Sequence, residues 1–203
     1  MQTVMDFLNE RFSAMLFDPA HTLDDAEVST LIDGATRAPS SYNMQNWRFV
    51  AVRSAPAKAR LRALAADQAK VTEAAVTFIV VGQLPDANVI PDRFAPLIAD
   101  GSIPAKVAES LAAGAAGLYA DPQMARDEAI RSASLSASFL MMAAAGLGFA
   151  SGPMIGFDAA GVVRAFGLAD GEVPAMLVAV GRAAPGNWPQ KPRRPIGDVL
   201  RIV

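Results

Sequence analysis

The stretch 76–81, Val-Thr-Phe-Ile-Val-Val, is an almost continuous apolar run of strand length. A strand with one face in water alternates polar and apolar side chains, so this run predicts a strand that is covered on both faces. Further strands are predicted at 48–53 and 174–180. Helices are predicted around and between them, at 4–12, 26–36, 56–66, 68–73, 104–118, 122–145 and 159–166. Periodicity alone leaves two fold classes open, α+β and α/β.

The predicted helix at 122–145 carries small or apolar residues on every face along 132–145, which indicates a helix buried all round. A membrane-spanning helix is the alternative. Charged residues at one end and four alternating serines leave an apolar stretch at the short limit for a span. A core or interface helix is therefore favoured.

Size and composition favour a single domain, residues 1–203, that pairs with a second copy of itself. A chain of 203 residues and 21.2 kDa suits one domain. A hydrophobic content of 52% and a mean hydropathy of +0.27 are high for a soluble monomer, which predicts a homodimer. The tail at 183–203 is rich in proline and basic residues, and we expect it to pack on the partner subunit.

Three prolines, Pro85, Pro91 and Pro96, predict irregular structure over 83–100. Variable loops often determine substrate choice, so this stretch is the candidate for a mobile or specificity-determining segment.

The residue inventory excludes several kinds of chemistry. No cysteine is present, which rules out disulfides, zinc–thiolate sites, iron–sulfur clusters and thiol nucleophiles. His21 is the single histidine, so neither a metal site nor a Ser-His-Asp triad is predicted. A net charge of −2 argues against nucleic-acid binding. The N-terminus lacks the pattern of a signal peptide, so we expect a cytoplasmic protein without membrane attachment.

The segment 38–49, Ala-Pro-Ser-Ser-Tyr-Asn-Met-Gln-Asn-Trp-Arg-Phe, is the strongest candidate for a ligand site. Pro39 ends the helix before it. Hydroxyl and amide side chains that suit a flat polar ligand follow at Ser40, Ser41, Asn43 and Gln45. The same side chains are ordinary in turns, where they bond their own backbone, so the residues alone leave both interpretations open.

Two other regions are candidates for binding. Cations and a hydroxyl that could hold an anion occur near both ends of the chain, at Arg11, Ser13, Lys191, Arg193 and Arg194. Arginine makes forked, charge-assisted bonds to phosphate, although a single surface cation is more often just solvated. The glycine-rich stretch 146–158 is predicted as a turn between two helices, where backbone could approach a flat ring; a plain helix C-cap would use the same residues.

These motifs, in this order, resemble those of the FMN-dependent nitroreductase family. The segment 39–49 is similar to the family's Pro-Ser-Ser-x-Asn-x-Gln-x-Trp-x-Phe motif. Arg11-x-Ser13 and 191–195 are similar to its two phosphate motifs, and 146–158 to its Gly-Leu-Gly…Gly-Phe-Asp element. The stretch 67–74 is similar to a segment that contacts the flavin pyrimidine edge. Small bacterial NAD(P)H nitroreductases linked to quinone stress are the members that it resembles most.

The resemblance implies an α+β three-layer sandwich, with a central, mostly antiparallel sheet flanked by helices. It also implies an intertwined homodimer with FMN between the subunits. The residues that it implies for cofactor binding are Arg11, Phe12, Ser13, Met15, Pro39, Ser40, Ser41, Asn43, Gln45, Asp67, Gln68, Pro153, Met154, Ile155, Gly156, Lys191 and Arg193.

The resemblance further implies an oxidoreductase in which NADH or NADPH reduces FMN at N5 and then leaves. A nitroaromatic, quinone or activated alkene follows, in a ping-pong order. No catalytic side chain is predicted, because the flavin itself carries the hydride. The alternative is a flavin-binding protein for sensing or storage; a serine hydrolase lacks both a base and a nucleophile elbow.

Three positions depart from the family pattern. Asn46 replaces a proline and is expected to loosen the turn. Met15 replaces a cation near the flavin and is expected to pack beside Phe17. Asp67 replaces an asparagine. Because an ionised carboxylate cannot donate a hydrogen bond, this change predicts a lower flavin reduction potential, unless Asp67 points away and Gln68 makes the contact instead.

Overall fold

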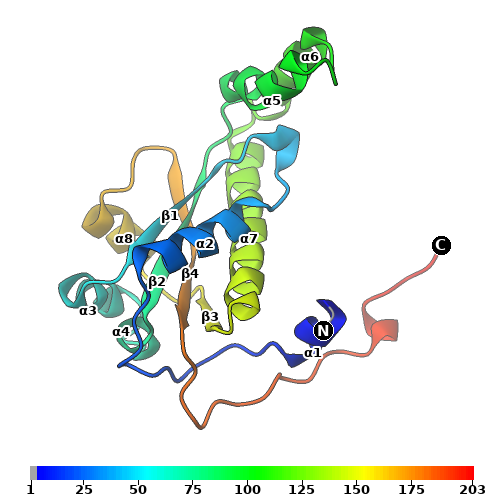
Figure 1. Cartoon of the computed structure of the whole chain (residues 1–203). Helices are drawn as coiled ribbons and strands as arrows, with labels where there is room; N and C mark the ends of the chain where they lie inside the picture. The colour runs from blue at the N-terminus through cyan, green and yellow to red at the C-terminus, as the bar shows by residue number, and fades with distance from the viewer. Residues whose placement is uncertain (1–3) are drawn as a thin grey trace.

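A computed structural model describes residues 4–203 (Figure 1). Its centre is one antiparallel sheet with the strand order β1-β2-β4-β3. The strands are β1 (Trp47–Val52), β2 (Val76–Gln83), β3 (Ala150–Met154) and β4 (Glu172–Gly181). The apolar run that begins at Val76 is therefore a central strand, and the fold class is α+β.

Helices cover both faces of the sheet, which gives three layers (Figure 1). On one face, Phe78 and Val80 pack with Leu31 and Leu140. These two leucines belong to α2 (Asp25–Thr36) and α7 (Pro122–Gly146). On the other face, Ile79 and Val81 pack against α3 (Ala55–Leu64), α4 (Lys70–Glu73) and α8 (Ala159–Phe166). The prediction of a strand covered on both faces is confirmed.

Two extensions leave the layered body at its opposite ends (Figure 1). At one end, α5 (Ile90–Ala99) and α6 (Ala105–Leu118) project as a helical arm. At the other end, α1 (Val4–Glu10) lies beside the C-terminal tail. That tail contains one short helix, η3 (Ile196–Asp198).

The helix α7 packs closely against the sheet. A Cβ atom built on Gly82 of β2 would lie 2.2 Å from the carbonyl oxygen of Ala129 on α7. The predicted helix at 122–145 is confirmed and its inner side belongs to the core. The expectation that it is buried all round is wrong for one copy of the chain, because Leu135 is 38% exposed and Ser138 is exposed as well. Within residues 4–203, no helix has the length and apolarity needed to cross a bilayer.

Replacing Gly82 by alanine should lower the free energy of unfolding by about 2–3 kcal/mol, because the new methyl group would overlap the α7 backbone. Chemical denaturation of the purified protein measures this. Gly117→Ala is the control: a Cβ atom at this position would meet no neighbouring atom of residues 4–203 within 4 Å, and alanine favours a helix. A Gly82→Ala variant as stable as the parent would contradict the close packing.

Two sequence-based expectations are wrong. The stretch 83–100 is not irregular, since Pro91 occupies the first turn of α5, where proline is tolerated. The stretch 146–158 is not simply a turn between helices, because it contains β3. A proline is tolerated at position 153 because β3 is an edge strand. A glycine is needed at position 152 because a Cβ atom built there would lie 2.4 Å from the carbonyl oxygen of Ala14.

The predicted helix starts are confirmed where a side chain caps them. Asp24 accepts from the backbone N–H of Glu27, and the Glu27 side chain accepts in return from the N–H of Asp24, which completes a capping box. Asp158 caps α8 by accepting from the N–H of Gly161. The first helix ends at Glu10, two residues earlier than the sequence predicts.

Candidate cofactor site

Two chain ends meet at the edge of the sheet and bring distant candidate residues together. Ser13 forms an isolated parallel bridge with Ser151 of β3. The tail is fastened beside it by Asn187, whose Oδ1 accepts from the backbone N–H groups of Met15 (2.7 Å) and Leu16 (3.0 Å). A small hollow results, lined by Phe12, Ser13, Met15, Trp188, Pro189, Gln190, Lys191 and Arg193. Residues about 180 positions apart therefore share one surface.

This hollow presents hydrogen-bond donors. The Lys191 ammonium lies 5.7 Å from the centre of the Trp188 ring. Arg193 Nη1 donates to the carbonyl oxygen of Lys191 at 2.7 Å, which leaves its other N–H groups available. Met15 is 51% exposed and lines the hollow, so it does not pack into the core beside Phe17 as the sequence predicts.

Lys70 adds a buried cation to the same region. This residue is only 7% exposed, its stem lies against Gly152, and no carboxylate among residues 4–203 forms an ion pair with it. Burial, and next the nearby charge of Lys191, lowers the pKa of Lys70 below its ordinary value of 10.5. A buried, unpaired ammonium is costly unless an anion joins it. The donor set therefore fits a phosphorylated ligand.

The loop before α4 and the turn after β3 face each other. Gln68 Nε2 donates to the carbonyl oxygens of Ala65 (3.1 Å) and Gly156 (3.4 Å). Ile155 is 79% exposed, whereas Met154 is buried in the core. Pro153 is half-buried between them. Gln68 and the turn at Gly156 thus line one accessible edge of the sheet, next to Lys70.

Asp67 lies at the rim of this edge in a left-handed conformation with φ 53°. Its carboxylate accepts from Arg62 Nε at 2.7 Å, and its side chain is 81% exposed. The negative charge that distinguishes Asp67 from the family's asparagine is therefore partly neutralised, and its effect on a bound flavin should be moderate.

Asp67→Asn should raise the reduction potential of bound FMN by about 10–30 mV, since it removes a negative charge that disfavours the reduced ring; for a two-electron couple 30 mV corresponds to about 1.4 kcal/mol. Equilibration with a reference dye measures the potential. Asp25→Asn is the matched control, because Asp25 forms an ion pair with Arg53 of similar exposure, and neither residue lies in a candidate cofactor segment. An unchanged or lower potential would show that Asp67 does not act on the ring.

In the serine-rich segment after α2, the side-chain oxygens of Ser40, Ser41 and Asn43 each accept a hydrogen bond. Ser40 Oγ accepts from the backbone N–H of Gln45 at 2.9 Å. Ser41 Oγ accepts from Tyr119 Oη at 2.7 Å, and Asn43 Oδ1 from Gln45 Nε2 at 3.2 Å. The turn interpretation is therefore confirmed, and the remaining hydroxyl and amide protons of the segment stay available to a ligand. Pro39 is exposed at its start.

The same segment is conformationally strained. Tyr42, Asn43 and Gln45 have φ values of 51°, 53° and 53°, in a region that L-residues other than asparagine rarely adopt. Such strain persists only where surrounding contacts enforce it, and it gathers at functional sites. Asn46 is one such contact, because its Nδ2 donates to the carbonyl oxygen of Gln83 at 3.0 Å and ties the turn to the end of β2.

The two groups of candidate residues lie at opposite ends of the sheet. The N–H of Gln83, at the end of β2, donates to the carbonyl oxygen of Asn46, whereas Ser151 pairs through Val180 with Val76 at its start. Eight residues of strand separate these ends by roughly 23 Å. Figure 1 shows the segment after α2 beside the helical arm and the N-terminal segment and tail at the far end. One copy of the chain does not bring the serines to the cations.

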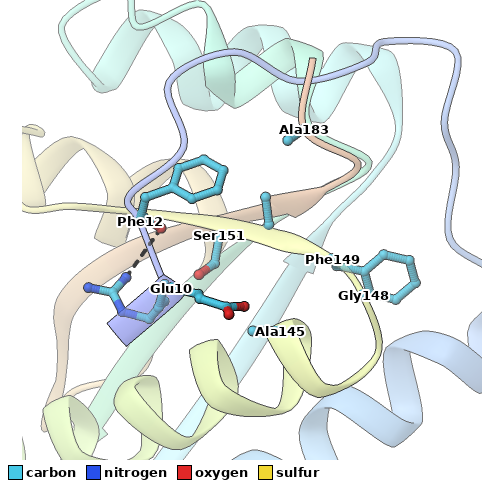
Figure 2. A pocket seen from close by; sticks show the side chains of 9 residues that line it. Glu10, Phe12, Ala145, Gly148, Phe149, Ser151 and Ala183 are labelled. Carbon is cyan, nitrogen blue, oxygen red and sulfur yellow. Dashed lines mark hydrogen bonds between the residues drawn. The ribbon is translucent and has the colours of Figure 1, made fainter. Parts of the chain in front are cut away.

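Arg11 borders a second, larger hollow of about 260 Å³ (Figure 2). Its Nη1 donates to the carbonyl oxygen of Phe12 at 3.4 Å. Glu10 and Ser151 face the hollow, and the rest of its wall is mostly small or apolar. The tail cations are absent from its lining, so this hollow is a poorer anion site than the smaller one. Arg11 does not line the hollow of Lys191 and Arg193, although Gln190 Nε2 donates to its carbonyl oxygen at 2.8 Å.

Sequence reasoning missed two residues that the structure brings to the candidate site. Lys70 lies within the motif at 67–74, but nothing in a sequence distinguishes a buried lysine from a solvated one. Tyr119 contacts Ser41 across 78 positions of sequence. Only tertiary structure could reveal that contact.

The fold is an α+β sandwich with a cationic set of donors at the edge of its sheet, and comparison with known proteins identifies its class. The family model described as "Nitroreductase family" matches residues 8–182. This chain therefore belongs to the nitroreductase family, which confirms the predicted family, fold and enzyme class, an oxidoreductase.

Individual relatives cover almost the whole chain. YodC of Bacillus subtilis, which carries the name of an NAD(P)H nitroreductase, is 31% identical over 183 residues, or 90% of this chain and 91% of YodC. Protein DrgA of Synechocystis is 34% identical over 203 residues, or 96% and 93% of the two chains. A nitroreductase from Exiguobacterium sibiricum, solved in complex with FMN, aligns with a TM-score of 0.90 at 26% identity, covering 100% of this chain and 98% of that one.

Proposed function

We propose that this protein is an FMN-dependent oxidoreductase that passes a hydride from NADH or NADPH to a nitroaromatic, quinone or activated alkene. The observation that carries the proposal is the buried, unpaired Lys70 beside Lys191, because this arrangement calls for an anionic ligand. The FMN-bound neighbour and the NAD(P)H nitroreductase name of YodC support the choice of cofactor and reductant.

We further propose that two copies of this single-domain chain form each site. Ser13, Lys70, Lys191 and Arg193 of one copy hold the anionic cofactor, and Gln68 with the turn at Ile155 and Gly156 lies along its ring. The donors that are missing from this end of the sheet come from Ser40, Ser41, Asn43 and Gln45 of the partner subunit. Exposed apolar residues of the tail, including Ile196, Val199 and Ile202, become covered by the partner.

The chemistry divides between cofactor and protein. Bound FMN supplies hydride acceptance and donation at N5. The protein binds and orients it, and its hydroxyl and amide donors suit the carbonyl oxygens of the ring. Reductant and acceptor use the same exposed edge in turn, which gives the ping-pong order. The proton that the acceptor takes up with each hydride can come from water, so no side chain needs to donate it. A cytoplasmic location would supply the reductant.

The visible absorption spectrum of the purified protein tests the cofactor, and NAD(P)H oxidation with a quinone tests the activity. We expect a yellow protein that oxidises NAD(P)H only when an acceptor is present. A colourless protein that also fails to bind added FMN would overturn the proposal. Stoichiometric FMN without turnover, across quinone, nitroaromatic and enone acceptors, would instead indicate a flavin-binding protein for sensing or storage.

A further inference from the structure

Tyr119 connects the helical arm to the serine-rich segment. It is the C-terminal cap residue of α6, and its phenol Oη donates to Ser41 Oγ at 2.7 Å. The Ser40 hydroxyl is held by its own turn, through the N–H of Gln45. Ser41 is held instead by a tertiary contact. The direction of the Ser41 hydroxyl therefore depends on Tyr119.

The contact determines what Ser41 can offer to a ligand. A serine hydroxyl has one proton and two acceptor lone pairs. Tyr119 occupies a lone pair, and none of the residues 4–203 accepts the serine proton, so that proton remains free to be donated. Burial raises the pKa of Tyr119 above its ordinary value of 10.0, which keeps the phenol protonated and able to donate.

The same tyrosine supports the strained backbone beside Ser41. The rings of Tyr42 and Tyr119 meet edge to face, with centroids 6.3 Å apart and an interplanar angle of 86°. Tyr42 carries the left-handed φ of 51° that turns the chain immediately after Ser41. Tyr119 thus contacts both the hydroxyl and the turn that presents it.

We propose that Tyr119 is a positioning residue that holds the Ser41 hydroxyl as a hydrogen-bond donor to FMN. This inference rests on the proposed function, because FMN is the ligand that receives the bond. Tyr119 itself does not touch the cofactor. It orders the Ser41 hydroxyl before the ligand arrives, so its effect on affinity passes entirely through Ser41.

FMN titration of the apoprotein, followed by quenching of flavin fluorescence, tests the proposal with four variants. Tyr119→Phe keeps the ring and should weaken FMN binding about three- to tenfold, the effect of one hydrogen bond. Ser41→Ala should weaken it by a similar or larger factor. The double variant should bind no more weakly than Ser41→Ala alone. Tyr42→Phe is the matched control, since the Tyr42 hydroxyl forms no hydrogen bond with residues 4–203, and its affinity should equal that of the parent.

Additive losses in the double variant would overturn the proposal, because a merely structural role for Tyr119 would act independently of the Ser41 hydroxyl. An unchanged affinity in Tyr119→Phe would overturn it as well. Both results would leave the proposed function intact, since the parent would still bind FMN. A parent that binds no FMN would overturn the proposed function and this inference together. Chemical denaturation of each apoprotein confirms that the variants are folded.

Discussion

Replacing Lys70 by methionine should weaken FMN binding roughly 10- to 100-fold and at the same time make the apoprotein about 1 kcal/mol more stable. The affinity falls because a charge-assisted contact to an anionic ligand is lost. The stability rises because methionine has a similar length and removes an ammonium that is largely desolvated and has no carboxylate partner among residues 4–203. Fluorescence titration measures the first effect and urea denaturation the second.

The control is Arg164→Met, since Arg164 is an exposed cation on α8, a helix that carries no candidate cofactor residue. It should change neither FMN affinity nor apoprotein stability appreciably. If Lys70→Met bound FMN as tightly as the parent, Lys70 would not belong to the cofactor site. If it instead destabilised the apoprotein, the ammonium would have an intramolecular partner.

The lowered pKa of Lys70 also sets the sign of a pH effect on the same apoprotein. Between the lowered pKa and 10.5, the folded chain binds fewer protons than the unfolded chain. Its free energy of unfolding should therefore rise with pH through this window, and the cost of the buried charge is fully present below the window. Lys70→Met should lose this rise, which denaturation at several alkaline pH values would show.

Mixed dimers should recover FMN binding that two defective parents have lost. Lys191→Glu with Arg193→Glu removes the tail cations, and Ser41→Asp replaces a donor by an acceptor on the opposite end of the sheet. In a mixed dimer, one site combines both defects and the other is intact. Random pairing makes half of the dimers mixed, so about one quarter of the parental sites should return.

Coexpression with two different affinity tags isolates the mixed dimer, in which about half of the sites should bind FMN. Each variant purified with both tags on identical copies is the control, and it should bind none. Mixed dimers without FMN would mean that the serines and the cations do not meet across subunits. A chain that elutes as a monomer at every concentration would contradict the dimer itself.

Long and strongly patterned elements were the most predictable part of the fold. The apolar run that begins at Val76 predicted a strand, which the structure places at the centre of the sheet. The small and apolar residues of 122–145 predicted a helix, which is α7. Errors arose where tertiary contacts decide the outcome. The sequence predicts Gly152 in a turn, but it lies in β3. A glycine is needed there because the Ala14 backbone passes close to it.

The candidate site was predictable in its residue types and unpredictable in its arrangement. Motifs identified Ser13, Lys191 and Arg193, and the structure places them around one hollow. The separation of Ser41 from these residues depends on strand order and register, which local sequence does not encode. The burial of Lys70 and the reach of Tyr119 likewise follow from packing between elements distant in sequence.

Because the serines of 40–41 and the cations of the tail lie at opposite ends of the sheet, retention of the cofactor should depend on how many subunits are paired. If each site needs two copies of the chain, its occupancy depends on the protein concentration as well as on the flavin concentration. Dilution would then release the flavin and separate the subunits together, while added FMN would pull monomers into dimers. Flavin binding would then drive dimerisation. Apoprotein at low concentration would remain inactive until the concentrations of both the protein and FMN increase.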